Sequence, residues 1–269
     1  MLPKLRRTWL IVLAVAIGTQ TGCAAVGDEP SDVESTTNDG RDPADLIGLK
    51  SQAVMNGHPA EAQSLAQGYV RLWGWFATEG VFKPYCSGSL LTGTMLITAT
   101  HCQTGSANNP VFAVGQIVAQ VGNQAFFVKG IAPMQSNLDQ TIMEVDGSFG
   151  TFRRRGIVFD GNKSKGAQVK CVGRGALFPD GSRDRNAPQT YTVVTVEGGA
   201  DLHPVFGNPR SFNASFNNRD QFVTHGDSGG GCFLIQLGVP ESAWPLIGVV
   251  RGSTGSGGIM NATTFANSL

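Results

Sequence analysis

Short apolar runs separated by glycine and proline constrain the fold of this chain more than any other feature. From residue 54 onward, the strand-like segments are residues 67–76, 89–99, 111–121, 125–131, 189–197 and 244–251. A turn at Gly122 and Asn123 separates two of these segments. The chain shows no long helical pattern, and its 36 glycines and 15% charged residues suit tight turns better than long helices. We therefore expect an all-β barrel or sandwich.

Charge and metal-ligand spacing argue against two classes of function. The chain carries 20 basic and 20 acidic residues, so its formal net charge is zero and a nucleic-acid partner is not expected. Three of the four histidines, His58, His203 and His225, stand apart from one another, and no metal-ligand spacing occurs. We therefore expect no metal and no other cofactor.

The N-terminus has the pattern of a secretory signal. Lys4, Arg6 and Arg7 precede an apolar run at residues 9–17, and small residues follow this run. The run is too short to span a bilayer. Residues 1–22 are expected to be a signal peptide, and a buried N-terminal helix is the alternative interpretation.

A cysteine directly follows the expected signal peptide. Residues 21–24, Thr-Gly-Cys-Ala, are similar to the cleavage site of bacterial lipoproteins, in which this cysteine is acylated. Gln20 departs from that pattern, because an aliphatic residue is usual there. A lipid on Cys23, which would anchor the protein to a membrane, is one expectation. Ordinary cleavage near Ala25 without a lipid is the other.

Residues 23–53 differ in composition from the rest of the chain. Between residues 28 and 45, seven acidic residues have only Arg41 as a counter-charge, with serine, threonine, asparagine and glycine among them. Such a stretch buries little apolar surface, so we expect a flexible linker or a propeptide. The folded domain is expected at residues 54–269.

Two segments carry residues suited to nucleophilic catalysis. In residues 90–102 an apolar strand ends in His101, which is followed by Cys102. In residues 225–231, Ser228 follows an aspartate within a run of glycines. A serine hydroxyl needs a neighbouring histidine as its base, and that histidine needs a carboxylate to fix its tautomer. The glycines allow backbone amides to converge on an oxyanion.

These segments resemble the trypsin/chymotrypsin family of serine proteases. The family pattern Thr-Ala-Ala-His-Cys is matched by Thr-Ala-Thr-His-Cys at residues 98–102, and Gly-Asp-Ser-Gly-Gly-Pro by Gly-Asp-Ser-Gly-Gly-Gly at residues 226–231. The resemblance extends over most of the chain from Val54 onward. It implies two six-stranded antiparallel β-barrels with the active site in the cleft between them. It also implies an exported serine endopeptidase that acts on protein or peptide substrates.

The resemblance implies a catalytic aspartate between these two motifs. The family pattern Asp-Ile-Ala-Leu-Leu is matched by Asp-Gln-Thr-Ile-Met at residues 139–143, with Gln140 and Thr141 as departures. Asp139 is therefore the expected third member, and Asp146 and Asp160 are the alternatives.

The resemblance also assigns a role to each residue of the expected site. Ser228 would attack the scissile carbonyl, His101 would transfer the proton, and Asp139 would orient His101. The backbone N–H groups of Gly226 and Ser228 would form the oxyanion hole.

The body of the chain holds four cysteines, which can pair in three ways. The resemblance implies a disulfide between Cys86 and Cys102, in the loop ahead of the expected catalytic histidine. It implies a second disulfide between Cys171 and Cys232, although the family usually has the latter cysteine two residues later.

The start of the expected domain is similar to the Ile-Val-Gly-Gly terminus of mature family members. Carried over, cleavage would free the amine of Val54, which would pair with Asp227. Ala53 precedes this bond in place of the usual basic residue, and Lys50 is an alternative cleavage site. The other interpretation is that no processing occurs.

Cleavage specificity is expected to differ from that of trypsin. Phe222, six residues before Ser228, stands at the position that forms the base of the primary pocket in the family. An acid there would attract Arg or Lys, so trypsin-like cleavage is not expected unless Asp220 turns into the pocket. At the pocket wall, Arg251 and Gly252 replace Ser-Trp-Gly and leave it one residue short. A binding module with an occluded pocket, or an esterase with the same triad, are the alternative functions.

Overall fold

The computed structural model describes residues 43, 58–59, 67–105, 111–134, 138–173, 190–202, 209–217, 223, 226–253 and 259–265. Their regular secondary structure is almost entirely β-strand. Their regular helices, beyond single residues, are the one-turn α3 (His101–Thr104) and the 3-10 turn η2 (Glu241–Ala243). Within this described part, no helix is long and apolar enough to cross a membrane. Two closed six-stranded antiparallel barrels confirm the expected fold class.

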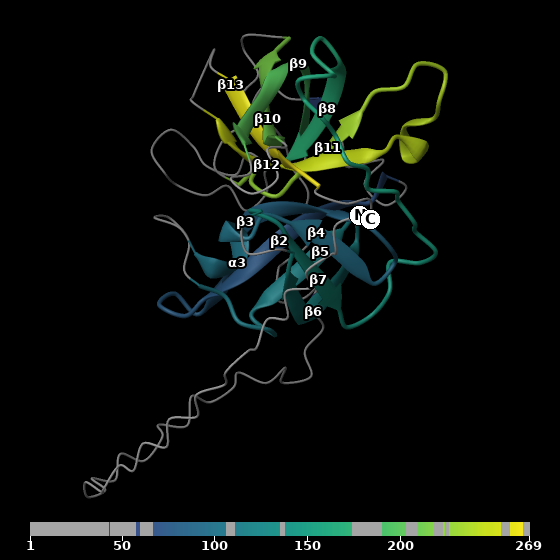
Figure 1. Ribbon diagram of the computed structural model, residues 1–269. Helices are drawn as coiled ribbons and strands as arrows, with labels where there is room; N and C mark the ends of the chain where they lie inside the picture. Colours follow the sequence, from purple (N-terminus) through teal and green to yellow (C-terminus); the bar gives the residue numbers. More distant parts are fainter. Residues whose placement is uncertain are drawn as a thin grey trace, which may run out of the picture. The chain divides into compact units, whose positions relative to one another are not determined.

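The first barrel has the closed strand order β2-β3-β4-β7-β6-β5 (Figure 1). Its strands are β2 (Tyr69–Phe76), β3 (Val81–Leu90), β4 (Met95–Thr98), β5 (Ile117–Val121), β6 (Gln124–Pro133) and β7 (Thr141–Val145). Side chains two residues apart on a strand share one face. This alternation sends Val70 and Leu72 of β2, and Met143 and Val145 of β7, into the same buried core. The expected turn at Gly122 and Asn123 joins β5 to β6.

The strand expected at residues 89–99 is in fact the end of β3, a turn and β4. The Thr92 hydroxyl accepts a hydrogen bond from the Met95 backbone N–H at 3.0 Å, which closes this turn. A Cβ atom at Gly93 would lie 1.8 Å from the carbonyl oxygen of Gly150, so only glycine fits there. The strand expected from residue 111 begins only at Ile117, as β5. Before it, the Gln116 N–H donates to the Ala113 carbonyl and closes a turn.

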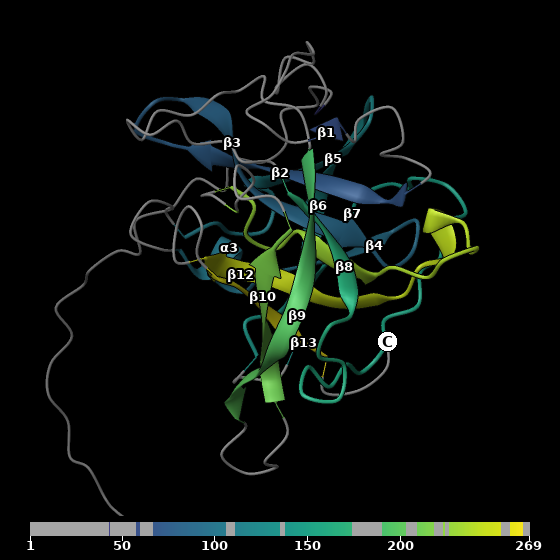
Figure 2. The ribbon, with the colours of Figure 1, turned by 90° about the horizontal axis from the view of Figure 1, so that it is seen from above.

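The second barrel consists of β8 to β13, with β8 pairing both β9 and β11 to close it. Its strands are β8 (Gln168–Gly173), β9 (Thr190–Leu202), β10 (Pro209–Phe216), β11 (Gly231–Leu234), β12 (Leu246–Ser253) and β13 (Ile259–Thr264). Figure 2 shows β9 and β10 side by side as its longest antiparallel pair. The two-residue strand β1 (His58–Pro59) pairs with the first residues of β9 and extends this sheet.

Apolar side chains from both barrels form a common cluster at their junction. Tyr69 and Ile97 of the first barrel are buried with Phe233 and Val249 of the second. The rings of Tyr69 and Phe233 are 5.6 Å apart between centroids. The barrels therefore share one hydrophobic seam, and residues on either side of it hold fixed relative positions.

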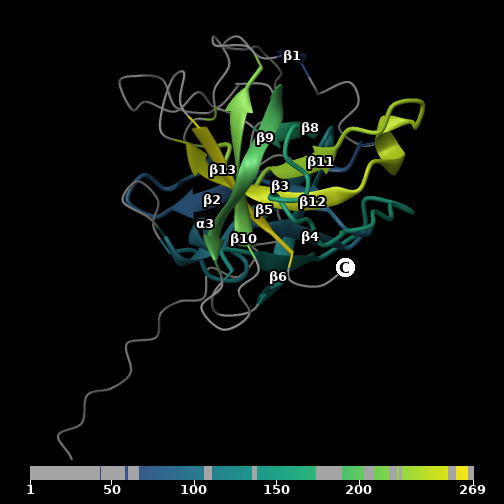
Figure 3. The same cartoon turned by 45° about the horizontal axis from the view of Figure 1, so that its top comes forward.

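An ion pair between a buried lysine and a partly exposed glutamate lies at the same junction. Lys170 of β8 contacts Glu241 at 2.5 Å, and Tyr69 of β2 donates a hydrogen bond to the same carboxylate oxygen. Glu241 belongs to η2, in the β11–β12 connection that projects from the second barrel in Figure 3. One carboxylate therefore bonds to groups from both barrels.

We expect Glu241→Ala to lower the free energy of unfolding by about 3–5 kcal/mol, because it leaves the buried Lys170 ammonium without its partner. Glu144→Ala is the matched control, since the Lys129–Glu144 pair at 3.1 Å is about half exposed. Its loss should cost no more than about 1 kcal/mol. Urea unfolding with intact disulfides measures both values, and equal costs would contradict a structural role for the pair between buried Lys170 and Glu241.

Candidate active site

His101 is presented at the end of β4 by the short helix α3. β4 ends at Thr98, and α3 begins at His101. The next residue, Cys102, is fully buried and bonded to Cys86 of β3. This disulfide ties the helix to the barrel wall and leaves the imidazole partly exposed.

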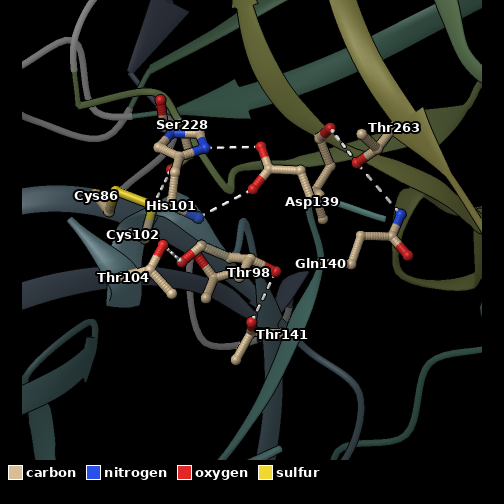
Figure 4. A network of polar contacts seen from close by, with 12 residues as sticks. Cys86, Thr98, His101, Cys102, Thr104, Asp139, Gln140, Thr141, Ser228 and Thr263 are labelled. Carbon is tan, nitrogen blue, oxygen red and sulfur yellow. Dashed lines mark hydrogen bonds and ion pairs between the residues drawn. A yellow bond between two sulfur atoms is a disulfide. The ribbon is translucent and has the colours of Figure 1, made fainter. Parts of the chain in front are cut away.

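Asp139 holds His101 by two hydrogen bonds (Figure 4). The distance between His101 Nδ1 and Asp139 Oδ2 is 2.7 Å, and the His101 backbone N–H donates to Asp139 Oδ1 at 2.9 Å. A carboxylate on Nδ1 leaves Nε2 as the nitrogen that can accept a proton. The structure therefore brings together the histidine and the aspartate that the sequence singled out.

Electrostatics keep the Asp139 carboxyl ionised. Burial by itself would raise its pKa, but the hydrogen bonds and charge of His101 offset this effect. The positive charge of Arg251 acts in the same direction as His101. The pKa of Asp139 consequently lies below its ordinary value of 3.8.

The two alternative aspartates have other surroundings. Asp146 follows β7 at the end opposite Asp139, and its backbone N–H donates to the carbonyl of Phe127. The five residues of β7, a length of roughly 17 Å, lie between these two positions. Asp160 caps a turn and pairs with Lys163 at 3.3 Å. Neither aspartate contacts His101.

The departures from the family pattern around Asp139 have polar partners. The Thr141 hydroxyl donates to the Thr100 hydroxyl at 3.0 Å. The family pattern has alanine at both of these positions, so the two threonine departures are hydrogen-bonded to each other. Gln140 is fully buried, and its amide donates to Thr263 of β13 at 3.3 Å (Figure 4). The residue next to Asp139 is thereby attached to the second barrel.

Ser228 lies in a tight loop just before β11. The backbone N–H of Gly229 donates to the Val250 carbonyl, and Val250 N–H donates to the Gly230 carbonyl, both at 2.8 Å. From the first barrel, the N–H of Ser87 donates to the Ser228 carbonyl at 2.9 Å. The loop is therefore anchored to both barrels.

Ser228 and His101 are adjacent across the junction. Figure 4 shows the Ser228 side chain next to the imidazole, on the side away from Asp139. No hydrogen bond joins the Ser228 hydroxyl to the ring, although both residues are among those described. Such catalytic hydrogen bonds often become short only when substrate binds.

The four cysteines pair as the resemblance implied. Cys86 bonds to Cys102, and Cys171 bonds to Cys232, which lies directly opposite it in the β8–β11 ladder. The displacement of Cys232 from its usual place therefore does not prevent pairing. His101 lies close to the first pair of sulfurs, but a disulfide offers no thiolate to a metal.

Several residues predicted for the site fall outside the described part of the chain. They are Cys23, Lys50, Val54, Asp220 and Phe222.

Asp227 and Gly252, predicted for the activation terminus and the pocket wall, are among the described residues. Asp227 is buried against Gly173, where a Cβ atom would approach its carboxylate to 2.2 Å. Gly252 follows a bulge in β12 and faces open space.

The lowered pKa of Asp139 gives an expected pH dependence of stability. Its contribution to the free energy of unfolding is fully present above pH 3.8, the ordinary pKa, and is lost as the pH falls through the lower pKa of the folded state. Asp139→Asn should therefore lose less free energy of unfolding than the parent protein below pH 3.8. Urea unfolding at a series of acidic pH values measures this difference, and parallel curves would contradict it.

A histidine–aspartate pair beside a serine is typical of serine hydrolases, and one class of these enzymes places it on β-barrels. Comparison with known families agrees with this geometry, because the family model for trypsin matches residues 54–268. The chain therefore belongs to the trypsin family, a family of serine proteases. No curated protein matches the chain.

Proposed function

We propose that the chain is an exported serine endopeptidase that hydrolyses peptide bonds through an acyl-enzyme. The observation that carries this proposal is the His101–Asp139 pair at 2.7 Å, directly beside Ser228. Membership of the trypsin family supports it, because that family consists of serine proteases.

In the proposed mechanism, the Ser228 hydroxyl attacks the scissile carbonyl while His101 Nε2 accepts its proton. Asp139 stabilises the imidazolium that forms, and its two hydrogen bonds keep the ring in one orientation. His101 then donates the proton to the leaving amine, which departs and leaves an acyl group on Ser228. Water hydrolyses this ester in a second round of the same proton transfers.

The negative charge that develops on the substrate oxygen needs hydrogen-bond donors. We assign this role to the backbone N–H groups of Gly226 and Ser228, which precede and include the nucleophile. In comparable enzymes, one such donor contributes about 3–4 kcal/mol to transition-state stabilisation.

Specificity follows from the residues proposed for the primary pocket. Phe222 at its base carries no charge, so cleavage after Arg or Lys is not expected. Gly252 at the wall adds no side chain, and a Cβ atom there would meet nothing within 4 Å. Small or apolar residues fit this chemistry better than basic ones.

Export and activation are part of the same proposal. Residues 1–22 would be removed as a signal peptide, and a lipid on Cys23 would hold the uncleaved chain at a membrane through the linker at residues 23–53. Disulfides persist outside the cytosol, and the two bonds in the structure fit that compartment. Cleavage before Val54 would free an amine for Asp227 and complete the domain at residues 54–269.

Labelling with a fluorophosphonate tests the proposed function. The protein, with and without cleavage before Val54, is treated and its intact mass measured beside Ser228→Ala and the exposed control Ser148→Ala. One adduct that disappears only in Ser228→Ala is the expected result. Adduct formation only after cleavage would add that the protein is a zymogen.

Absence of labelling in a folded sample would reject the proposed protease activity and leave the binding module as the function. Phe222 at the pocket base and the shortened wall at Gly252 favour that alternative. If labelling succeeds, turnover of a peptide library against small esters separates an endopeptidase from an esterase.

A further inference from the structure

Ser87 holds the loop of the proposed nucleophile from the opposite barrel. It lies on β3, next to the disulfide cysteine Cys86, and is fully buried. Its backbone N–H donates to the Ser228 carbonyl at 2.9 Å, and its hydroxyl donates to the Gly226 carbonyl at 2.8 Å. One residue therefore binds both ends of the segment that carries the proposed oxyanion hole.

The Ser87 hydroxyl fixes a particular peptide unit. The carbonyl of Gly226 belongs to the planar peptide that lies between the two proposed oxyanion donors, the N–H groups of Gly226 and Ser228. Gly226 has a φ of +101°, and glycine, which has no Cβ, adopts both signs of φ with little steric cost. A hydrogen bond from a buried side chain removes that freedom.

The neighbouring peptide is fixed independently of Ser87. The Asp227 carbonyl accepts a hydrogen bond from Gly230 N–H at 2.9 Å. Because a trans peptide points its C=O and N–H in opposite directions, this bond sets the direction of the Ser228 N–H. On the other side of this peptide lies the one between Gly226 and Asp227, which the Ser87 hydroxyl holds.

Ser87 is itself held in place by a hydrogen bond and by a neighbouring disulfide. The Thr98 hydroxyl donates to the Ser87 carbonyl at 2.7 Å, and Thr98 is the last residue of the strand that leads to His101. The disulfide between Cys86 and Cys102 joins the residues that directly adjoin Ser87 and His101. The proposed base and the anchor of the nucleophile loop therefore share one rigid support.

We propose that Ser87 is a positioning residue that keeps the Gly226–Ser228 segment in the conformation able to stabilise an oxyanion. This inference rests on the proposed function. It predicts that loss of the Ser87 hydroxyl slows formation of the tetrahedral intermediate without weakening substrate binding.

The test compares Ser87→Ala with Ser89→Ala. Ser89 lies two residues along the same strand and is equally buried, but its hydroxyl has no hydrogen-bond partner. The rate of fluorophosphonate labelling should fall about 10- to 100-fold in Ser87→Ala, because a buried carbonyl loses its donor. It should stay within about twofold of the parent in Ser89→Ala. For ester turnover, kcat should fall and KM should not.

A second measurement separates positioning from a general structural role. An alkyl trifluoromethyl ketone forms a hemiketal with an active serine, and ¹⁹F NMR follows the pKa of its oxyanion. Ser87→Ala should raise that pKa relative to the parent and to Ser89→Ala. Ser87→Thr retains the hydroxyl and should restore the pKa even if its added methyl lowers the melting temperature.

The outcomes distinguish this inference from the proposed function. A parent protein that does not react at Ser228 rejects the function itself. A reactive parent whose Ser87→Ala variant has an unchanged hemiketal pKa overturns the role of Ser87, whatever its labelling rate. If Ser87→Ala does not fold, the comparison is made with Ser87→Gly.

Discussion

Replacing Asp139 with asparagine is expected to lower kcat by on the order of 10⁴-fold, with little change in KM. The carboxylate accepts hydrogen bonds from both the ring and the backbone N–H of His101. An asparagine amide would offer an N–H to Nδ1 and favour the tautomer in which Nε2 carries the proton. His101 could then no longer act as the base. Turnover of a small ester measures the effect.

The other two aspartates provide controls of the same chemistry. Asp146→Asn and Asp160→Asn make the same substitution at sites that do not contact His101, so both variants should retain kcat within about twofold. A loss at Asp146 or Asp160 that equals the loss at Asp139 would show that the third member of the triad is wrongly assigned.

Gly229→Ala is expected to abolish labelling of Ser228 and to destabilise the protein by on the order of 4 kcal/mol. The backbone φ at Gly229 is +80°, and a Cβ atom there would lie 2.0 Å from the Thr98 hydroxyl oxygen and 2.4 Å from the Ser87 carbonyl oxygen. The loop would have to leave the first barrel to make room. Urea unfolding and fluorophosphonate labelling measure the two effects.

Gly115→Ala separates backbone strain from crowding. Gly115 has nearly the same φ, +83°, but a Cβ atom there meets nothing within 4 Å. We expect a cost of only about 1 kcal/mol and full labelling. If both alanine variants behave alike, contact between the serine loop and the first barrel is not what requires glycine at residue 229.

Local sequence signals predicted much of this architecture. Alternating apolar residues and the Gly122–Asn123 turn indicated strands that the structure contains, and the motifs around His101 and Ser228 indicated the fold through their family resemblance. The split of residues 89–99 could not be predicted in this way. It depends on the approach of Gly93 to Gly150, which is a contact between distant parts of the chain.

The residues that link the two barrels could not be predicted from the sequence either. Gln140 is bonded to a residue 123 positions later in the chain, and Ser87 to one 139 positions later. Neither residue type suggests such a role by itself, because serine and glutamine are usually exposed. Local sequence patterns do not indicate hydrogen bonds between residues so far apart in the chain, whereas the structure shows them directly.

The position of the small strand β1 limits how far the chain end freed by the proposed cleavage would have to reach. It pairs with β9, which pairs with β8, and β8 ends at Gly173 against the Asp227 carboxylate. Two strand spacings amount to roughly 10 Å. The four residues from Val54 to β1 extend to roughly 14 Å, so a new amine could reach Asp227 while β1 stays paired. Under the proposed processing, the new N-terminus at Val54 would move to Asp227 while the pairing of β1 with β9 stays as it is.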